Sequence, residues 1–165
     1  MLLTEFMGDE NIKEVKIVTF GDGIIPVRKT KGAAGFDCYA NADAVIKPGE
    51  RKLVPLGFAL QLPENFCAYI TPRSGLSKSG IDIATGLIDS DFRGEVSANV
   101  INNRTTCKDF DNEGDTVDLS TFKIHKGDRI CQIVIQELPR IYFNYVDELD
   151  KTERDTGGFG STGVR

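Results

Sequence analysis

A turn that carries carboxylates is the first candidate for chemistry in this sequence. Apolar runs at residues 81–88 and 96–101 flank a turn at 89–95 that is rich in Asp, Ser and Gly, an arrangement typical of a β-hairpin. Asp89 directly follows the first apolar run, so we expect it at the edge of a buried strand, where partial exclusion of water can prepare a carboxylate to act as a base. Alternatively, Asp89 and Ser90 only start the turn, because both side chains hydrogen-bond backbone groups there.

The C-terminal residues are a second candidate, for binding an anion. Residues 154–163 combine glycines and hydroxyl side chains with one arginine and one phenylalanine. This composition is typical of a flexible linker. The alternative is an arm that becomes ordered over an anion, because glycine lets successive N–H groups point at phosphate oxygens, hydroxyls add donors and arginine supplies a fixed charge.

The charge and histidine content exclude several other chemistries. A zinc site built on histidines or a nucleophile–histidine pair would have to use His125, the single histidine, which we expect on the surface where a strand ends in a turn. If a metal takes part, an oxygen-preferring ion such as Mg²⁺ is expected. The net charge of −5 argues against broad binding to nucleic acid, which requires a basic surface.

The elements that must position these groups read as strands. A chain of 165 residues with 40% hydrophobic residues fits one domain. Short β-prone runs, beginning with residues 14–20, alternate with turn signals and predict an antiparallel β-sandwich or barrel. Helical periodicity is nearly absent; we expect about one turn of helix at residues 74–79, between Pro72 and Gly80.

The remaining segments predict the setting of this domain. No apolar run can span a bilayer and residues 1–13 read as a leader without function, so a soluble, intracellular protein of the cytoplasm or nucleus is expected, with no membrane partner. The four cysteines show no C-x-x-C spacing, so we expect them to be reduced thiols in the core. These residues are Cys38, Cys67, Cys107 and Cys131.

One acidic segment, residues 107–121, stands apart between two better strand candidates. Its residues 109–114 place acidic groups at alternate positions with glycine sixth, as in an EF-hand loop. Ser120 occupies the position where a bidentate glutamate is needed, and neither flank is helical. We therefore expect a solvated acidic hairpin extension, with weak cation binding as the alternative.

Five stretches in this order resemble the trimeric deoxyuridine triphosphatase (dUTPase) family. They are AGFDCYA at 34–40, PRSGLSKSG at 72–80, GLIDSDFRGE at 86–95, GDRICQ at 127–132 and RDTGGFGSTG at 154–163. The resemblance implies an all-β fold, a distorted jelly roll or β-clip barrel over residues 14–150 with 107–121 as an insertion. It also implies a homotrimer with shared active sites, in which residues 151–165 form an arm that closes over a neighbouring subunit's site.

The resemblance implies hydrolysis of dUTP to dUMP and pyrophosphate, which limits uracil incorporation into DNA and supplies dUMP for dTMP synthesis. Water would attack the α-phosphorus with Asp89 as general base, and Asp37 would hold Mg²⁺ through water. The substrate-binding residues carried over from the family's motifs are Arg73, Ser74, Gly75, Gly86, Leu87, Ile88, Phe92, Ser97, Gln132, Arg154, Phe159, Gly160, Ser161 and Thr162.

The phosphate-binding residues also have simpler readings. Pro72 to Gly75 could be an ordinary helix start, although a helix N-terminus is also an anion site, and the resemblance puts Arg73, Ser74 and the Gly75 N–H at the triphosphate. Gln132 could simply face water from its apolar strand, whereas the matching glutamine of the family reaches the phosphates.

The resemblance also implies that the hairpin selects uracil and that the arm closes over the site. Backbone groups of the hairpin would read the uracil edge, so that cytosine leaves bonds unmade and thymine meets backbone with its methyl group. Phe92 stands where the family usually has tyrosine, and its ring would still lie against the deoxyribose. Arg154, with the tail hydroxyls, would complete the phosphate site while Phe159 stacks over uracil. Asp155 replaces the family's usual glycine and adds negative charge, which would weaken closure unless the side chain points outward.

Two other functions fit the same scaffold. A related dCTP deaminase would carry a catalytic glutamate about where this chain has Asn99, and an amide cannot shuttle the proton. A non-catalytic nucleotide-binding module would be marked by loss of a functional residue. Asp37, Asp89, Arg154 and Phe159 are all present.

Overall fold

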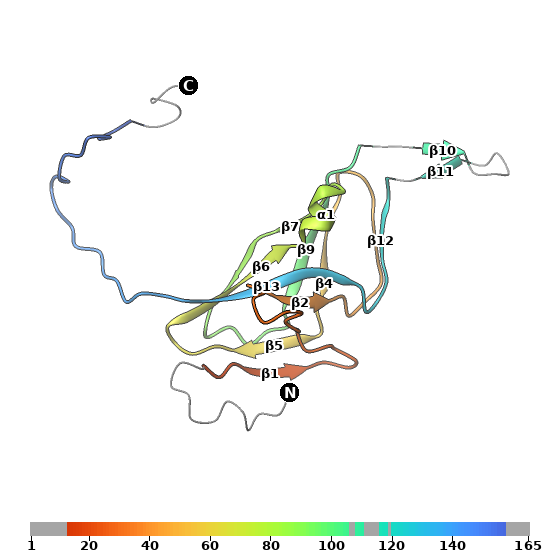
Figure 1. The fold of residues 1–165 in the computed structure, drawn as a ribbon, viewed down its shortest axis with the longest axis horizontal. Helices are drawn as coiled ribbons and strands as arrows, with labels where there is room; N and C mark the ends of the chain where they lie inside the picture. Colours follow the sequence, from red (N-terminus) through yellow and green to blue (C-terminus); the bar gives the residue numbers. More distant parts are fainter. Residues whose placement is uncertain (1–12, 106–107, 111–115, 119, 158–165) are drawn as a thin grey trace.

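A computed structural model describes residues 13–105, 108–110, 116–118 and 120–157 (Figure 1). The described residues form thirteen strands and one short helix, which confirms the predicted all-β class and the helical turn after Pro72. The elements are β1 (Lys16–Thr19), β2 (Phe36–Tyr39), β3 (Ala44–Ile46), β4 (Arg51–Pro55), β5 (Phe58–Gln61), β6 (Phe66–Pro72), α1 (Ser74–Lys78), β7 (Ile81–Ala84), β8 (Gly86–Ile88), β9 (Ser97–Asn102), β10 (Lys108–Phe110), β11 (Thr116–Asp118), β12 (Phe122–Ile124) and β13 (Arg129–Glu137).

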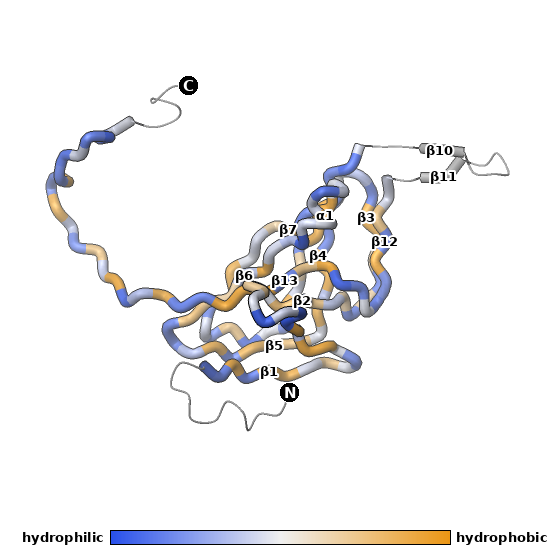
Figure 2. The backbone as a smooth tube through the Cα atoms, in the orientation of Figure 1, coloured by the Kyte–Doolittle hydropathy of each residue, from blue (hydrophilic) through white to orange (hydrophobic). Residues whose placement is uncertain are grey.

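Two larger antiparallel sheets enclose the core. The four-stranded sheet has the order β2-β13-β6-β8 and the three-stranded sheet the order β4-β9-β7, with the pairs β1-β5 and β12-β3 beside them. Burial alternates along β9, so that Ala98, Val100 and Asn102 point inward. Apolar residues recur along the strands of the barrel (Figure 2), and their inward members, including Ile46, Leu56 and Phe58, form one buried cluster.

Asn102 is a polar member of this interior that the sequence did not single out. Its side chain is fully buried, and its Nδ2 donates to the carbonyl oxygens of Ile46 and Ser120, each at 2.8 Å. Its Oδ1 accepts the backbone N–H of Arg104 at 3.1 Å. The side chain therefore ties β9 to β3 and to the base of the acidic segment.

The hairpin predicted over residues 81–101 exists only in part. β7 pairs with β9 as expected, with Ile83 opposite Val100. β8 instead joins the other sheet, where Leu87 lies opposite Tyr69 of β6. Because the chain changes sheets between β7 and β8, Ile83 and Ile88 reach the same core from two sides. The turn after β8 therefore connects the two sheets and is not the tip of a simple hairpin.

The predictions for the cysteines and for the histidine are confirmed where they fall on described residues. Cys38, Cys67 and Cys131 are buried free thiols, and the His125 side chain is 75% exposed. β10 and β11 form an antiparallel hairpin within the acidic segment that projects from the barrel (Figure 1). Residues 1–12 of the leader and Cys107 lie outside the described residues.

After β13 the chain leaves the barrel. Residues 139–157 contain no strand or helix, and in Figure 1 they extend away from the sheets as a single arm. No helix in the described part of the chain has the length and apolar character needed to cross a membrane.

Candidate active site

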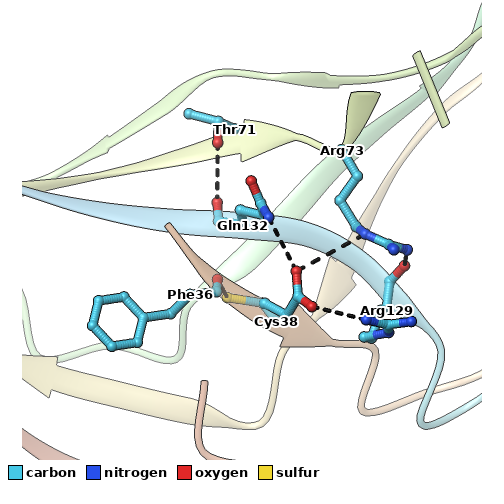
Figure 3. Close-up of polar contacts among 7 residues, drawn as sticks. Phe36, Cys38, Thr71, Arg73, Arg129 and Gln132 are labelled. Atoms are coloured by element: carbon cyan, nitrogen blue, oxygen red, sulfur yellow. Dashed lines mark hydrogen bonds and ion pairs between the residues drawn. The ribbon is translucent and has the colours of Figure 1, made fainter. Parts of the chain in front are cut away.

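A buried carboxylate forms the floor of the candidate site. Asp37 of β2 lies opposite Gln132 of β13 in the sheet, and its side chain is only 6% exposed. Oδ2 accepts a hydrogen bond from Arg129 Nη1 at 3.0 Å and Oδ1 accepts one from Gln132 Nε2 at 3.1 Å (Figure 3). Arg73 approaches from the third side, with its Nε 4.0 Å from Oδ1. Three side chains, two from β13 and one from the residue before α1, thus converge on one carboxylate.

Opposing effects set the charge of this carboxylate. Burial raises the pKa of Asp37, but the hydrogen bonds from Gln132 and Arg129 and the charges of Arg73 and Arg129 outweigh it, so the pKa lies below the ordinary value of 3.8. Asp37 is therefore ionised at neutral pH, and together with the two guanidinium groups it leaves a net positive site.

The start of α1 forms one wall above this floor. Arg73 has extended backbone at the N-cap position, without a side-chain cap, and its guanidinium donates to the Arg129 carbonyl at 2.6 Å. The first backbone N–H groups of a helix have no partner inside the helix, so those of Ser74 and Gly75 are available to an anion. A cavity of about 230 Å³ opens here, lined by Lys29, Ala33, Gly35, Asp37, Arg73, Ser74, Gly75 and Gln132.

Five residues expected in the site therefore meet in one cavity. They are Asp37, Arg73, Ser74, Gly75 and Gln132, and they come from segments far apart in the sequence. A larger cavity of about 410 Å³ lies between β1 and β13, but its lining is apolar apart from Lys13 and Arg28 and includes none of the expected residues. Apolar walls cannot hold a phosphate, so the smaller, polar cavity is the better candidate.

Asp89 lies elsewhere, directly after β8. It is exposed in the single chain, which corrects the expectation that its own strand partly excludes water from it. Gly86 and Leu87 are also exposed, whereas Ile88 is buried in the core. If water is to be partly excluded from Asp89, a surface outside this chain has to cover it.

Two further expected residues lie near β8 and β9. Phe92 is 45% exposed and folds over the backbone of Gly94, where a Cβ atom would meet the Phe92 ring at 2.5 Å. Ser97 begins β9 opposite Pro55 of β4 and is half-buried. Neither residue lines the polar cavity.

The register of the four-stranded sheet gives the separation between the two carboxylates. Asp37 is level with Gln132 and Thr71, whereas Asp89 is one residue beyond Ile88, which pairs with Ala68. The two carboxylates are therefore four residues apart along the strand direction and three strands apart across the sheet, which amounts to about 20 Å. Asp89 and Asp37 of one chain cannot contact the same phosphate group.

Of the substrate-binding residues expected in the arm, only Arg154 is among the described residues. Arg154 is exposed, and its Nε donates to the carbonyl of Gly157 at 2.9 Å, so the guanidinium bends back onto its own turn. Asp155 has a positive φ of 42°, a left-handed conformation that favours glycine. Phe159, Gly160, Ser161 and Thr162 are not among the described residues.

Two cationic residues of the site were not assigned a role from the sequence. Arg129 belongs to the GDRICQ stretch, but it lies 92 positions from Asp37 in the sequence, so their contact cannot be predicted from motif spacing. Lys29 lines the cavity from the loop before β2. The only signal for Lys29 was its place in a basic run just before the AGFDCYA stretch.

Comparison with known proteins decides the family. The family model described as dUTPase matches residues 22–163. This chain belongs to the dUTPase family. A deoxyuridine 5'-triphosphate nucleotidohydrolase of Cowpox virus (strain GRI-90 / Grishak) is 41% identical over 143 residues, which cover 85% of this chain and 86% of the viral protein. The dUTPase resemblance of the five stretches is thereby confirmed.

Solved dUTPases share the fold. The structure of Staphylococcus bacteriophage 80alpha dUTPase with dUPNHPP matches with a TM-score of 0.82 at 27% identity, and covers 93% of this chain and 100% of the phage chain. A mutant dUTPase from phage phi11 of S. aureus, whose structure describes the coordination of a structural Mg(II) ion, matches with a TM-score of 0.73 at 25% identity and covers 84% of this chain and 100% of its own. The jelly-roll architecture expected for a dUTPase is confirmed.

Proposed function

We propose that this chain hydrolyses dUTP to dUMP and pyrophosphate, and that the polar cavity binds the phosphates. The observation that carries the proposal is the convergence of Asp37, Arg73 and Gln132 with the first N–H groups of α1 on one cavity. Fixed donors and a guanidinium match the charge of a triphosphate, and phosphoryl transfer depends mainly on positioning and charge neutralisation. The cowpox virus relative carries the name of this activity.

The reaction needs one base and one anion-binding surface. Asp89 accepts a proton from water as the water oxygen bonds to the α-phosphorus, and the bond from that phosphorus to the bridging oxygen breaks. Pyrophosphate leaves, held by Arg73 and by the N–H groups of Ser74 and Gly75. Gln132 both donates to Asp37 and lines the cavity, so it orients the carboxylate beside the leaving group.

Asp37 fits an outer-sphere role toward Mg²⁺. Among the described residues no group of three or more His, Cys, Asp and Glu side chains could hold a metal, so an ion here would rely on water and substrate oxygens, as Mg²⁺ commonly does. Asp37 stays ionised and retains lone pairs for metal-bound water. When bound, Mg²⁺ would neutralise phosphate charge, and the phage phi11 dUTPase supports the choice of metal.

We place β8 at the uracil base. β8 pairs only with β6, so the N–H and C=O groups on its other side have no strand partner in the described chain. Such an edge can bind a uracil as it would bind a strand, and cytosine would leave these groups unpaired. Asn99 of β9, which lies between Leu53 and Ala84, cannot shuttle a proton, and this argues against the deaminase alternative.

The functional unit is proposed to be a homotrimer. The 20 Å between Asp37 and Asp89, roughly estimated from strand spacings, requires that the base acting on a bound nucleotide come from another chain. The arm also exposes large apolar side chains, including Tyr142 at 86%, Phe143 at 96% and Leu149 at 87%. Such a row of apolar side chains indicates burial against another surface. Residues 151–165 would then close over a neighbouring site, with Arg154, Ser161 and Thr162 at the phosphates and Phe159 over uracil.

Substrate selectivity tests the activity. Pyrophosphate release is measured with dUTP, dCTP, dTTP and UTP, and selective turnover of dUTP is expected. Asp89→Asn should abolish turnover while the nucleotide still binds, because the amide keeps the shape but cannot accept the proton. An Asp89→Asn variant that keeps its activity would remove Asp89 from the role of base, and equal turnover of dCTP would contradict the uracil assignment.

Mixing two impaired variants tests the shared site. Asp37→Asn and Asp89→Asn chains are denatured together, refolded and assayed. If each site takes Asp37 and Asp89 from different subunits, random assembly restores both carboxylates in about one quarter of the sites. Each variant refolded alone is the control. A mixture that is no more active than the average of the two controls, although both variants form trimers, contradicts a site shared in this way.

A further inference from the structure

The loop between β1 and β2 is held firmly against the candidate site. Its base is closed by Val27 and Asp37, whose backbone N–H groups donate to each other's carbonyls at 3.1 and 2.9 Å. Beside this base Gly35 is buried, and a Cβ atom there would meet the Cβ of Gln132 at 3.2 Å. The absence of a side chain at Gly35 thus lets the loop backbone lie directly on β13. Lys29, Ala33 and Gly35 of this loop line the polar cavity.

Lys29 gives this loop an uncommitted positive charge. The residue lines the same cavity as Arg73. Asp37, the carboxylate on the floor, already accepts hydrogen bonds from Arg129 and Gln132 and needs no further cation. Within the part of the chain that the structure describes, Lys29 itself forms no hydrogen bond or ion pair. Its ammonium is therefore available to an anion in the cavity.

We propose that Lys29 is a second cationic ligand of the substrate, binding the two outer phosphates from the loop while Arg73 binds them from the helix side. The inference rests on the proposed function, because it takes the anion to be a nucleoside triphosphate. The outer phosphates are favoured over the α-phosphate because Asp89 has to reach the α-phosphorus from another chain, which leaves the cavity to the departing pyrophosphate. A lysine suits this place, since its flexible point charge can follow pyrophosphate as it leaves.

The test compares Lys29→Ala with Lys31→Ala, a lysine of the same exposed loop that does not line the cavity. Calorimetry measures binding of inorganic tripolyphosphate and of dUMP to the full-length protein, and steady-state assays give KM and kcat for dUTP. For Lys29→Ala we expect roughly three- to fivefold weaker tripolyphosphate binding and a similar rise in KM, the effect of one partly exposed charge contact. Binding of dUMP, which lacks the outer phosphates, should not change. Lys29→Arg should restore most of the affinity.

Each result decides one point. Tripolyphosphate binding by Lys29→Ala equal to wild type overturns the inference, even if dUTP turnover is normal. An equal loss in Lys31→Ala also overturns it, because the effect would then come from the general charge of the loop. If the wild-type protein does not turn over dUTP but Lys29→Ala still weakens tripolyphosphate binding, the proposed function fails and the anion contact of Lys29 stands. Circular dichroism confirms that the variants are folded.

Discussion

Replacing Asp37 with asparagine removes the charge at the floor of the site while keeping its shape. The amide oxygen of the introduced side chain can accept the hydrogen bond from Arg129, as the carboxylate does at 3.0 Å. The amide nitrogen can donate to Gln132 if the Gln132 amide turns over, because glutamine offers both a donor and an acceptor whereas arginine offers only donors. The hydrogen bonds can therefore be kept, and the loss is confined to the attraction between the carboxylate and two guanidinium groups.

The expected loss of stability is modest. The two guanidinium groups lie 3.0 and 4.0 Å from Asp37, but their side chains are 41% and 31% exposed, so water screens both pairs. At roughly 0.5–1 kcal/mol for each partly exposed pair, the free energy of unfolding should fall by about 1–2 kcal/mol. For a chain of this size that corresponds to a decrease of about 2–8 °C in Tm, measured by differential scanning fluorimetry.

The pH dependence identifies the cause. Because the pKa of Asp37 is lowered in the folded protein, its contribution is complete above the unfolded value, near 3.8, and is lost as the pH falls through the folded value. The difference in Tm between wild type and Asp37→Asn should therefore stay constant from pH 8 to about pH 5 and narrow below about pH 4. Glu64→Gln, at an exposed turn position, is the control and should show no difference.

Activity gives a separate readout of the same substitution. If Asp37 holds the water shell of Mg²⁺, Asp37→Asn should lower pyrophosphate release from dUTP by about 10- to 100-fold and raise the Mg²⁺ concentration needed for half-maximal activity. The reasoning is refuted if the variant matches wild type in both Tm and Mg²⁺ dependence. A Tm difference that is as large at pH 3 as at pH 8 would show that packing, and not charge, makes Asp37 stabilising.

Two further substitutions test the frame of the site and the arm. Asn102→Ala removes both donors to the Ile46 and Ser120 carbonyls from a fully buried position. The free energy of unfolding, measured by urea titration, should fall by about 2–4 kcal/mol. A loss under about 1 kcal/mol would contradict this role of the buried side chain. Asp155→Gly relieves the left-handed backbone at φ 42° and removes a negative charge beside Arg154. The KM for dUTP should therefore fall by about two- to fivefold. An unchanged or higher KM would show that Asp155 does not oppose arm closure.

Local sequence patterns were sufficient to predict much of the fold. Alternating apolar runs gave the strands around Ile17 and Gln132, and the residues Pro72 and Gly80 bounded the single helix correctly. These features depend on neighbours in the chain, so they can be read without knowing the fold. Five residues of the polar cavity were found through their resemblance to a family, because composition and spacing alone left simpler interpretations open for Asp37 and Gln132.

Features that depend on distant contacts were not predictable in this way. β8 looks like a continuation of β7 in sequence, and only the packing of Ile88 into the shared core shows why the chain changes sheets after Ala84. Arg129 supports Asp37 across the β2–β13 pairing, which no sequence spacing reports. The exposure of Asp89 was likewise not predictable. An apolar run before a carboxylate predicts that the carboxylate is partly buried, but in the single chain Asp89 is exposed.

The four-stranded sheet explains how one chain could serve two sites. β6 and β13, seven and nine residues long, lie at its centre and pair along all of β6. One end of the same sheet face carries Asp37 and the opposite corner leads to Asp89, so these central strands act as a rigid spacer between them. In the proposed trimer, the Asp37 end of each subunit meets the Asp89 end of its neighbour, a heterologous contact that closes after three copies. A substitution that bends β13 should then impair two sites at once, because it misplaces a phosphate-binding floor in one and a base in the other.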